Sequence, residues 1–464
     1  MARANSYDEW KAHAKAWDAA TGAEEWRRID RTRLYDYRQI SLRLNRLRNL
    51  RKQGDDTGLL FTLNEGIHGN MGGMGRAALY HRAKVGTKKL IEDYVAEIAS
   101  AIDHLRTVDS PDIPVAVKKD FFERANQCYG CTSLMLSGGG ALGFFHFGVT
   151  RVLRQQGIMP KVISGASAGS IAAAIMGTHT DQEFETLFDN RHLLVETRRE
   201  ARWMRRLLLG EQAQLETDDL VKLLERLIPD LTFQEAYEKT GYKINISVSP
   251  AEMHQSSRML NAIASPNVLI RSAVMASCAV PGVFPPVSLQ AKDMDGRKVP
   301  YLATRKWVDG SITGDLPAKR LARLYGVNHY VVSMINPIAA PVLSRRPDGK
   351  GVYNYAAKIT KSVVRSGLEQ YRDFARKRLP EYTRLNLMVN GVYGLVNQDY
   401  SGDINIMPAF RFVDPRKLLA NLNEKDLLWL IESGEKATWP HVERMRISMQ
   451  INQVLEKGLD ALSN

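Results

Sequence analysis

One serine in this sequence stands in a pattern that nucleophilic catalysis uses. The run Gly165-Ala-Ser167-Ala-Gly169 follows the short apolar stretch KVIS and opens a stretch of small residues. In a G-x-S-x-G turn between a strand and a helix, the serine sits on a strained backbone that exposes its hydroxyl. The chain folds back on itself there, so the positions two before and two after the serine must be small. The pattern predicts that Ser167 is a nucleophile and that Gly165 and Gly169 support it.

A glycine-rich run precedes this serine by one predicted strand–helix unit. Gly138-Gly139-Gly140-Ala-Leu-Gly143 stands between the strand-like TSLMLS and a helix-like stretch. As a G-x-G-x-x-G run it could bind a dinucleotide, but that site needs a carboxylate about 20 positions on, and segment 158–165 has none. Glycines that only form a tight turn are a second alternative. Backbone N–H groups at a helix N-terminus can also stabilise an oxyanion. We therefore expect Gly138, Gly139 and Gly140 to form an oxyanion hole, with Gly143 in the supporting motif.

A serine nucleophile needs a proton acceptor, which a histidine or a carboxylate could provide. His329 and His441 could complete a Ser-Asp-His triad, but one begins an apolar strand-like run and the other lies in a helix-like stretch, so we expect both to be structural. Asp309 ends the strand-like run RKWVD, directly before Gly310. Carboxylates at the carboxyl ends of strands face the crevice in which open α/β proteins bind ligands. As the sole base, Asp309 would need its pKa raised by partial burial.

Two further residue spacings are compatible with metal binding or with acyl transfer, but neither spacing favours that function. Cys128-Tyr-Gly-Cys131 could be half of a zinc site, yet the sequence has three cysteines and no second pair, so no metal is expected. His104 and Asp109 have the H-x4-D spacing of glycerolipid acyltransferases. Two residues at one spacing occur readily by chance, so the end of a surface helix is the favoured interpretation. We assign no metal and no cofactor.

The elements that must position these residues differ along the chain. Residues 1–125 show apolar side chains at helical spacing, and SPDIP at 110–114 marks a linker. From Thr132 short β-rich runs alternate with helical ones, which predicts a mainly parallel sheet covered by helices on both faces. Beyond residue 337 helical patterns return. The predicted domains are a helical domain at 1–125, an α/β domain at 132–337 and a mostly helical C-terminal extension at 338–464.

Composition and charge exclude some classes of function. The 464 residues are 44% hydrophobic and 25% charged, as in an ordinary globular chain. A net charge of +13 is compatible with nucleic acid, with an anionic membrane surface or with a plain solvated surface. No zinc-finger spacing, RNP-like strand or Lys/Arg block is present, so we expect no nucleic-acid partner. The few cysteines, the lack of an apolar leader and the lack of a membrane-spanning apolar run predict a cytoplasmic protein that is not secreted.

The order of a glycine-rich loop, G-x-S-x-G and D-G resembles the patatin-like phospholipase family. Residues 132 to about 337 carry the resemblance, including the run from Ala276 to Val287 and Asp315-Leu-Pro317. The resemblance implies a three-layer α/β core and a Ser-Asp dyad without histidine. By position, Ser167 then corresponds to the nucleophile, Asp309 to the general base and Gly138 to Gly140 to the oxyanion hole. Two positions depart from the family's usual pattern: Leu142 stands where a basic residue is usual, and Ser311 stands where glycine or alanine is usual.

The N-terminal segment narrows the resemblance. The runs Tyr7–Trp10, Leu34–Asp36 and Gly86–Tyr94 resemble the helical DUF3336 domain, which precedes the patatin core in storage-triacylglycerol lipases of eukaryotes and in their bacterial relatives. The resemblance implies a hydrolase of glycerolipid esters with triacylglycerol as the first candidate substrate. A phospholipase A or lysophospholipase is the alternative, and a non-catalytic lipid- or nucleotide-binding module is less favoured. The sequence does not predict the oligomeric state.

One amphipathic segment could bring such an enzyme to its substrate. On a helical wheel of residues 197–209, Trp203, Leu207 and Leu208 lie on an apolar half and arginines lie on the other. A basic face opposite a Trp/Leu face suits a helix at a lipid interface. We expect these three residues to contact a membrane or lipid-droplet surface. A surface helix that packs the same face on the core is the alternative.

Overall fold

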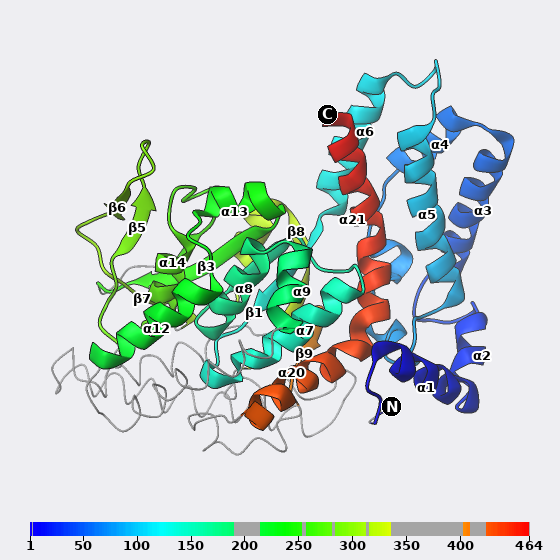
Figure 1. Ribbon diagram of the computed structural model, residues 1–464. Coiled ribbons are helices and arrows are strands. Elements are labelled where there is room, and N and C mark those ends of the chain that lie inside the picture. Colours follow the sequence, from blue (N-terminus) through cyan, green and yellow to red (C-terminus); the bar gives the residue numbers. More distant parts are fainter. Residues whose placement is uncertain are drawn as a thin grey trace, which may run out of the picture. The chain divides into compact units, whose positions relative to one another are not determined.

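The computed structural model describes residues 1, 3–189, 214–252, 257–280, 284–311, 315–335, 402–408 and 424–463 (Figure 1). The chain forms two compact units. The first, the helical unit, comprises Met1–Thr132, Ala322–His329 and Thr438–Asn464. The second, the sheet unit, comprises Ser133–Leu321 and Tyr330–Ala437. The predicted C-terminal extension at 338–464 therefore has described parts in both units, and the predicted domain boundaries stay a prediction.

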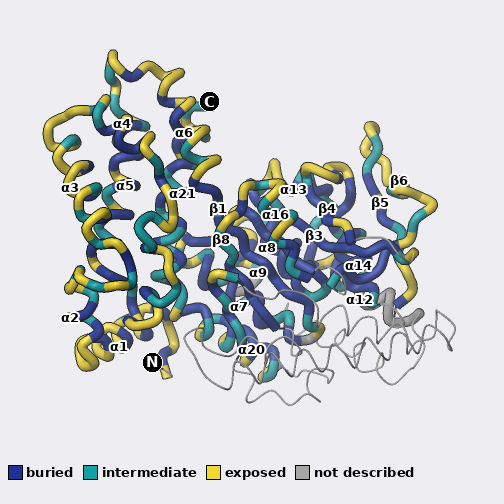
Figure 2. The backbone as a smooth tube through the Cα atoms, turned by 180° about the vertical axis from the view of Figure 1, so that it is seen from behind, coloured by how far each residue is buried: buried dark blue, intermediate teal, exposed yellow. Residues whose placement is uncertain are grey.

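The helical unit is built around one long amphipathic helix. Its helices are α1 (Tyr7–Ala20), α2 (Ala23–Arg28), α3 (Tyr37–Gln53), α4 (Asp56–Asn64), α5 (Lys89–Thr107), α6 (Val115–Tyr129) and α21 (Val442–Ser463), with short 3-10 turns at Met71–Gly73, Ala77–Leu79 and Trp439–His441. Helix α5 packs against α3 and α21, and α21 also packs against α6. In Figure 2 α3 is mostly exposed, whereas α5 carries many more buried residues along its length, as their apolar patterns require. From α21, Ile447, Ile451 and Leu455 complete a core that otherwise comes from the N-terminal helices.

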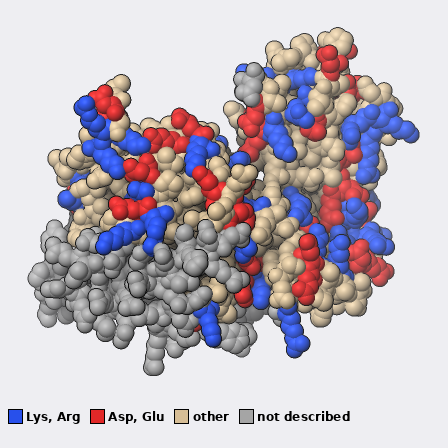
Figure 3. Space-filling view, viewed as in Figure 1, with Lys and Arg blue, Asp and Glu red and all other residues tan. Residues whose placement is uncertain are grey.

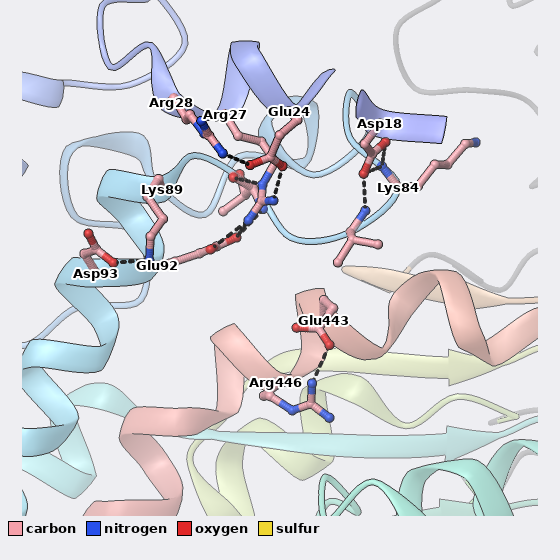
Figure 4. A network of polar contacts seen from close by, with 12 residues as sticks. Asp18, Glu24, Arg27, Arg28, Lys84, Lys89, Glu92, Asp93, Glu443 and Arg446 are labelled. Atoms are coloured by element: carbon pink, nitrogen blue, oxygen red, sulfur yellow. Dashed lines mark hydrogen bonds and ion pairs between the residues drawn. The ribbon is translucent and has the colours of Figure 1, made fainter. Parts of the chain in front are cut away.

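Polar groups fix the helix ends of this unit (Figure 4). The guanidinium group of Arg27 pairs with Glu24 at 2.7 Å and with Glu92 at 2.9 Å, which joins α2 to α5. The carboxylate of Asp18 is buried and accepts the backbone N–H groups of Lys84 and Val85 at 2.8 and 2.9 Å. Buried charges are tolerated only when they are paired in this way. The helical unit is thus held by polar contacts as well as by its core.

Most residues of a seven-stranded sheet belong to the sheet unit. Its strands are β1 (Cys131–Leu136), β2 (Val162–Gly165), β3 (Lys243–Pro250), β4 (Arg258–Leu260), β7 (Trp307–Asp309), β8 (Val327–Ser333) and β9 (Ile404–Ile406). The order is β4-β3-β2-β1-β8-β9, with β7 also paired to β3. Strand β2 is parallel to β1 and β3, and β8 is parallel to β9, whereas β4 and β7 run antiparallel to β3. The prediction of a mainly parallel sheet is confirmed.

Helices enclose this sheet. They are η3 (Gly140–Gly143), α7 (Phe144–Gln155), α8 (Ala168–Thr178), α9 (Asp181–Asp189), α12 (Gln214–Leu227), α13 (Phe233–Thr240), α14 (Ile270–Cys278), α16 (Ala318–Tyr325) and α20 (Glu424–Thr438), and a hairpin is formed by β5 (Leu289–Lys292) and β6 (Lys298–Tyr301). Every residue of β2 is buried, and successive strand residues point to opposite faces, so both faces of the sheet are covered. The predicted three-layer α/β core is confirmed.

Charge is mixed over the part of the surface that Figure 3 shows. Basic and acidic side chains alternate there on the described residues, so the net charge of +13 does not gather into one basic patch on this face. Several arginines of α3 are paired across to α5, as when Arg48 and Arg51 approach Glu97 at 3.6 and 2.6 Å. Among the described residues, no helix has the length and apolar character to span a membrane.

Candidate active site

Ser167 occupies a sharp turn between β2 and α8. It caps the N-terminus of α8 with φ 51° and ψ −125°, and it is one of two non-glycine residues with positive φ in the described chain. Such a conformation costs roughly 1–3 kcal/mol for a residue with a side chain. A Cβ atom at Gly165 would overlap the carbonyl of Gly169, and one at Gly169 would overlap the carbonyl of Leu136. The glycines of the G-x-S-x-G run are therefore required by close backbone contacts.

Ser277 holds this turn from a neighbouring helix. The Ser167 backbone N–H donates to the Ser277 hydroxyl at 3.0 Å, and that hydroxyl donates to the Ser247 carbonyl on β3 at 2.8 Å. Ser277 lies in α14 and is fully buried. The strained turn is thus tied to the sheet through one side chain. Ser277 was not predicted as a site residue, although it stands within the run from Ala276 to Val287.

Asp309 reaches Ser167 from β7. The carboxylate is 2% exposed, accepts the Ser311 N–H at 2.7 Å, and lies close enough to the side chains of Ser311 and Ser167 for both to lower its pKa. Burial raises the pKa of Asp309 to about 6, and these interactions oppose the rise because they stabilise the carboxylate. The predicted burial of this carboxyl group is present.

The position of Asp309 has a different origin from the one expected. The expectation used a rule for the carboxyl ends of parallel strands, but β7 is antiparallel to β3 and pairs Asp309 with Val248. The Asp309 N–H donates to the Ala279 carbonyl at 2.9 Å, just after α14. A Cβ atom at Gly310 would overlap the Ser247 carbonyl, so the chain after Asp309 runs directly against β3.

The glycine loop lies against Ser167 and Ser311. A Cβ atom at Gly138 would stand 3.3 Å from the Ser167 Cβ and 3.1 Å from the Ser311 Cβ. A Cβ atom at Gly143 would stand 3.0 Å from the Ala168 Cβ. Gly140 has φ 56°, in the left-handed region that favours glycine. The loop between β1 and α7 can approach the nucleophile this closely because it has no side chains there.

The amides of this loop are not equivalent. The Gly138 N–H donates to Oδ1 of Asp315 at 2.7 Å, so it is already engaged. Within the described chain, the N–H groups of Gly139 and Gly140 donate to no protein acceptor. The expectation of three oxyanion donors stays a prediction; for Gly138, a buried carboxyl group already accepts the hydrogen bond of its N–H. Gly139 and Gly140 keep donors that a ligand could use.

Known proteins are similar in sequence to most of this chain. The family model described as "Patatin-like phospholipase" matches residues 134–322, and the one described as "Domain of unknown function (DUF3336)" matches residues 1–127. Triacylglycerol lipase ptl3 of Schizosaccharomyces pombe is 32% identical over 453 residues, which cover 95% of this chain and 92% of that protein. The chain belongs to the patatin-like phospholipase family. This confirms the resemblance inferred from the sequence and, at the level of the family, the expectation of an ester hydrolase.

Other relatives are longer than this patatin-like chain. Triacylglycerol lipase 4 of Saccharomyces cerevisiae is 33% identical over 473 residues, which cover 95% of this chain and 50% of that protein. Triacylglycerol lipase SDP1L of Arabidopsis thaliana is 29% identical over 480 residues, which cover 100% of this chain and 58% of that protein. The chain thus spans only half to three fifths of the length of these two relatives. Among solved structures, VipD from Legionella pneumophila matches 66% of this chain and 67% of that one with a TM-score of 0.29 and 14% identity, too low a similarity to extend the argument.

A histidine that the sequence did not single out lies beside the patatin-like loop. His146 is fully buried in α7; its Nε2 lies 2.9 Å from the Ser137 carbonyl and its Nδ1 lies 2.7 Å from the Ser333 hydroxyl. A carbonyl oxygen can only accept, so Nε2 carries the proton and Nδ1 accepts from Ser333. Burial lowers the pKa of His146 to about 4. This neutral ring holds the residue that precedes Gly138 and has no free nitrogen for proton transfer.

The two histidines proposed for a triad have other surroundings. Nδ1 of His329 lies 3.1 Å from the Thr132 hydroxyl in the helical unit. His441 ends a short 3-10 turn of that unit, and burial, together with Arg444 and His81, lowers its pKa to about 4. Ser167 and Asp309 belong to the sheet unit. These contacts agree with structural roles for both histidines.

The remaining sequence candidates can be placed briefly. His104 lies in α5 with Nε2 2.7 Å from Asp56, as at a surface helix end. Cys128 is exposed, and Cys131 contacts the Tyr325 carbonyl. No group of three or more His, Cys, Asp or Glu residues suitable for a metal occurs in the described part of the chain. Trp203, Leu207 and Leu208 lie outside the described residues.

Proposed function

We propose that the protein is a serine acyl hydrolase that cleaves glycerolipid esters, with triacylglycerol as the first candidate substrate. The observation that carries the proposal is the approach of the Ser167 side chain, at the N-terminus of α8, to the buried Asp309 carboxylate, whose pKa it lowers. A strained strand–helix turn exposes the nucleophile, and a carboxylate of raised pKa is a better proton acceptor than an ordinary one. A module that only binds lipid or nucleotide would not require this pairing.

The first half of the reaction follows from these positions. Ser167 Oγ attacks the ester carbonyl while its proton passes to Asp309, and a tetrahedral oxyanion forms. The amides of Gly139 and Gly140 supply donors to this oxyanion, aided by the positive end of α8, at which the nucleophile stands. The leaving alcohol takes the proton from Asp309, and the acyl group remains as an ester on Ser167.

The second half repeats the proton transfer with water. Asp309 accepts a proton from a water molecule that attacks the acyl ester, the same amides hold the second oxyanion, and the fatty acid leaves as Ser167 regains its proton. No step uses a metal or a cofactor. The proposal is therefore that of a Ser167–Asp309 dyad, supported by Gly143, Gly165, Gly169 and Gly310.

The substrate class is proposed from the relatives. The yeast and plant proteins that match most of this chain carry the name triacylglycerol lipase, and the model that matches the sheet unit carries the name phospholipase. Phospholipase A or lysophospholipase activity is accordingly the second candidate. We also propose that the protein works in the cytoplasm at the surface of a membrane or lipid droplet, with Trp203, Leu207 and Leu208 in contact with lipid.

Two experiments test the activity. A fluorophosphonate probe should label the wild-type protein and not a Ser167→Ala variant, because only an activated serine reacts. Hydrolysis of triacylglycerol, phosphatidylcholine and lysophosphatidylcholine should then be compared side by side, with EDTA present in a parallel series. We expect the highest rate on triacylglycerol and no effect of EDTA. Labelling that persists in Ser167→Ala would contradict the proposed nucleophile.

A further inference from the structure

We propose that Asp315 is a positioning residue that determines which loop amides face the reacting carbonyl. Its Oδ1 accepts the Gly138 N–H at 2.7 Å, so this amide points to Asp315 and those of Gly139 and Gly140 are left for the oxyanion. The inference rests on the proposed hydrolase function. It adds a residue to the site that acts only through the loop.

The contact is built into the interior of the sheet unit. Asp315 is fully buried, and its bond to Gly138 is at the short end of the range for N–H···O bonds. The peptide that it holds is the one against the nucleophile, since a Cβ atom at Gly138 would stand 3.3 Å from the Ser167 Cβ. A rotation of this peptide would therefore move the following two amides relative to Ser167.

Other groups hold the residue before Gly138. The Ser137 carbonyl accepts from His146, and the Ser137 hydroxyl accepts the Ile335 N–H at 2.9 Å. The Ser137 N–H donates to the Ser333 carbonyl at 3.1 Å. The chain therefore enters the loop from an anchored position. The Ser137 carbonyl and the Gly138 N–H belong to one planar peptide group, so His146 holds this group at its carbonyl and Asp315 holds it at its N–H. Loss of Asp315 should therefore alter the loop without releasing the strand.

The chemistry of this contact needs an acceptor oxygen rather than a negative charge. Burial raises the pKa of Asp315 well above its usual range, the Gly138 N–H opposes the rise, and the charge of Asp309 adds to it. A neutral carboxyl group at Asp315 still offers its carbonyl oxygen to Gly138. An asparagine amide offers the same oxygen.

The experiment compares Asp315→Ala with Asp315→Asn in the full chain. It measures kcat and KM on p-nitrophenyl butyrate and the inhibition constant of an alkyl trifluoromethyl ketone, whose serine adduct carries an oxyanion. For Asp315→Ala we expect kcat to fall about 100-fold, as when one oxyanion donor is removed, with KM changed by less than about threefold. The inhibition constant should rise by a factor similar to that by which kcat falls. For Asp315→Asn both quantities should stay within about tenfold of wild type, because the acceptor oxygen is retained.

Asp18→Ala is the matched control. Asp18 is also a buried aspartate that accepts backbone N–H groups, but in the helical unit. This variant should be less stable to heat, yet its kcat and its inhibition constant should match the wild type at a temperature at which it is folded. A general effect of losing a buried aspartate is thereby separated from an effect on the loop.

The outcomes distinguish this inference from the proposed function. Wild-type kcat and inhibition in Asp315→Ala, or an Asp315→Asn variant as inactive as Ser167→Ala, would overturn the role of Asp315 and leave the hydrolase intact. Activity that survives in Ser167→Ala would overturn the hydrolase mechanism and the role of Asp315 with it. If Asp315→Ala does not fold, kcat and the inhibition constant of the Asp315→Glu variant test the inference instead. It keeps the carboxyl group but moves its oxygen by one methylene, so kcat and inhibition should both weaken, and wild-type values would refute the inference.

Discussion

The Ser277 hydroxyl links the Ser167 backbone N–H to the carbonyl of Ser247 on the central sheet. One side chain thus supports a backbone conformation that residues other than glycine rarely adopt.

The first prediction concerns this link. Ser277→Ala leaves a buried N–H and a buried carbonyl without their partner, which should lower the free energy of unfolding by about 1–3 kcal/mol. Because the serine turn loses its tie, kcat should fall at least about tenfold, which corresponds to about 1.4 kcal/mol in the barrier. Urea unfolding and ester hydrolysis measure the two effects. Ser272→Ala, in the same helix α14, is the control, since its hydroxyl contacts Leu269 and Gln290 instead. Equal loss of kcat in both variants would argue against a special role for Ser277.

Strain at Ser167 gives the second prediction. Ser167→Ala and Ser167→Gly should both lose at least 99% of the activity (about 100-fold), since residual catalysis without the nucleophile is small. They should differ in stability, because glycine adopts φ 51° without the steric cost that alanine keeps. We expect Ser167→Gly to be more stable than Ser167→Ala by roughly 1 kcal/mol. Thermal unfolding of the two inactive proteins tests this, and equal midpoints would mean that the turn is not strained.

The third prediction concerns pH. With a pKa of about 6, Asp309 accepts a proton only when ionised, so kcat/KM should fall as the pH drops through about 6. Ser311→Ala removes a side chain that lowers the pKa of the carboxyl group, so the pKa should rise and the acid limb should move to higher pH. Rate profiles from pH 4.5 to 8 (about three half-unit steps below the midpoint and about four above it) measure both effects. A profile that is flat to pH 4.5 (about 1.5 units below that pKa) would contradict Asp309 as the base.

The same shift predicts a change in stability. The folded-state pKa of Asp309 is raised above its usual value of 3.8, so its favourable contribution is present at low pH and is lost as the pH rises to about 6. Asp309→Asn has no charge to bury, so at neutral pH it should be inactive but more stable than wild type. The gain should be on the order of 1–3 kcal/mol. Urea unfolding at acid and neutral pH measures it, and a variant that is less stable at both would contradict the raised pKa.

The histidines give the fourth prediction. His329→Ala and His441→Ala should keep wild-type turnover per folded molecule, since neither side chain takes part in the proposed proton transfer. Both variants are compared at a temperature at which circular dichroism shows them folded. A folded histidine variant as inactive as Ser167→Ala would restore a triad.

The fifth prediction concerns the lipid surface. Trp203→Ser combined with Leu207→Ser should weaken binding to anionic liposomes and hydrolysis of emulsified triacylglycerol, because apolar side chains supply much of interfacial affinity. Hydrolysis of a soluble short-chain ester should be unchanged. Unfolding, or an equal loss on both substrates, would assign the segment to the protein core.

Local patterns in the sequence predicted much of the sheet unit. TSLMLS, KVIS, KINISVS and RKWVD appear as β1, β2, β3 and β7, and the glycine pattern placed the turn at Ser167. These features depend on neighbouring residues, which a sequence displays directly. The direction of β7 could not be inferred, because it depends on pairing with a distant strand.

Long-range partners account for what the sequence did not show. Asp315 and Ser277 act on residues far along the chain, and neither has a spacing that links it to Gly138 or Ser167. Asp315 stood within the family resemblance as part of Asp-Leu-Pro, which indicated its position but not its contact. His146 appeared in the sequence as one polar residue of an amphipathic helix, although it is buried beside the loop.

The packing of α21 among the first helices has a consequence for synthesis of the protein. Helices α3, α5 and α6 leave the ribosome before the sheet unit, whereas the side chains of Ile447, Ile451 and Leu455 that complete their core are translated after it. Until then, apolar surface on the early helices stays uncovered and open to chaperones. The part of the chain that is made first is therefore the part that finishes folding last.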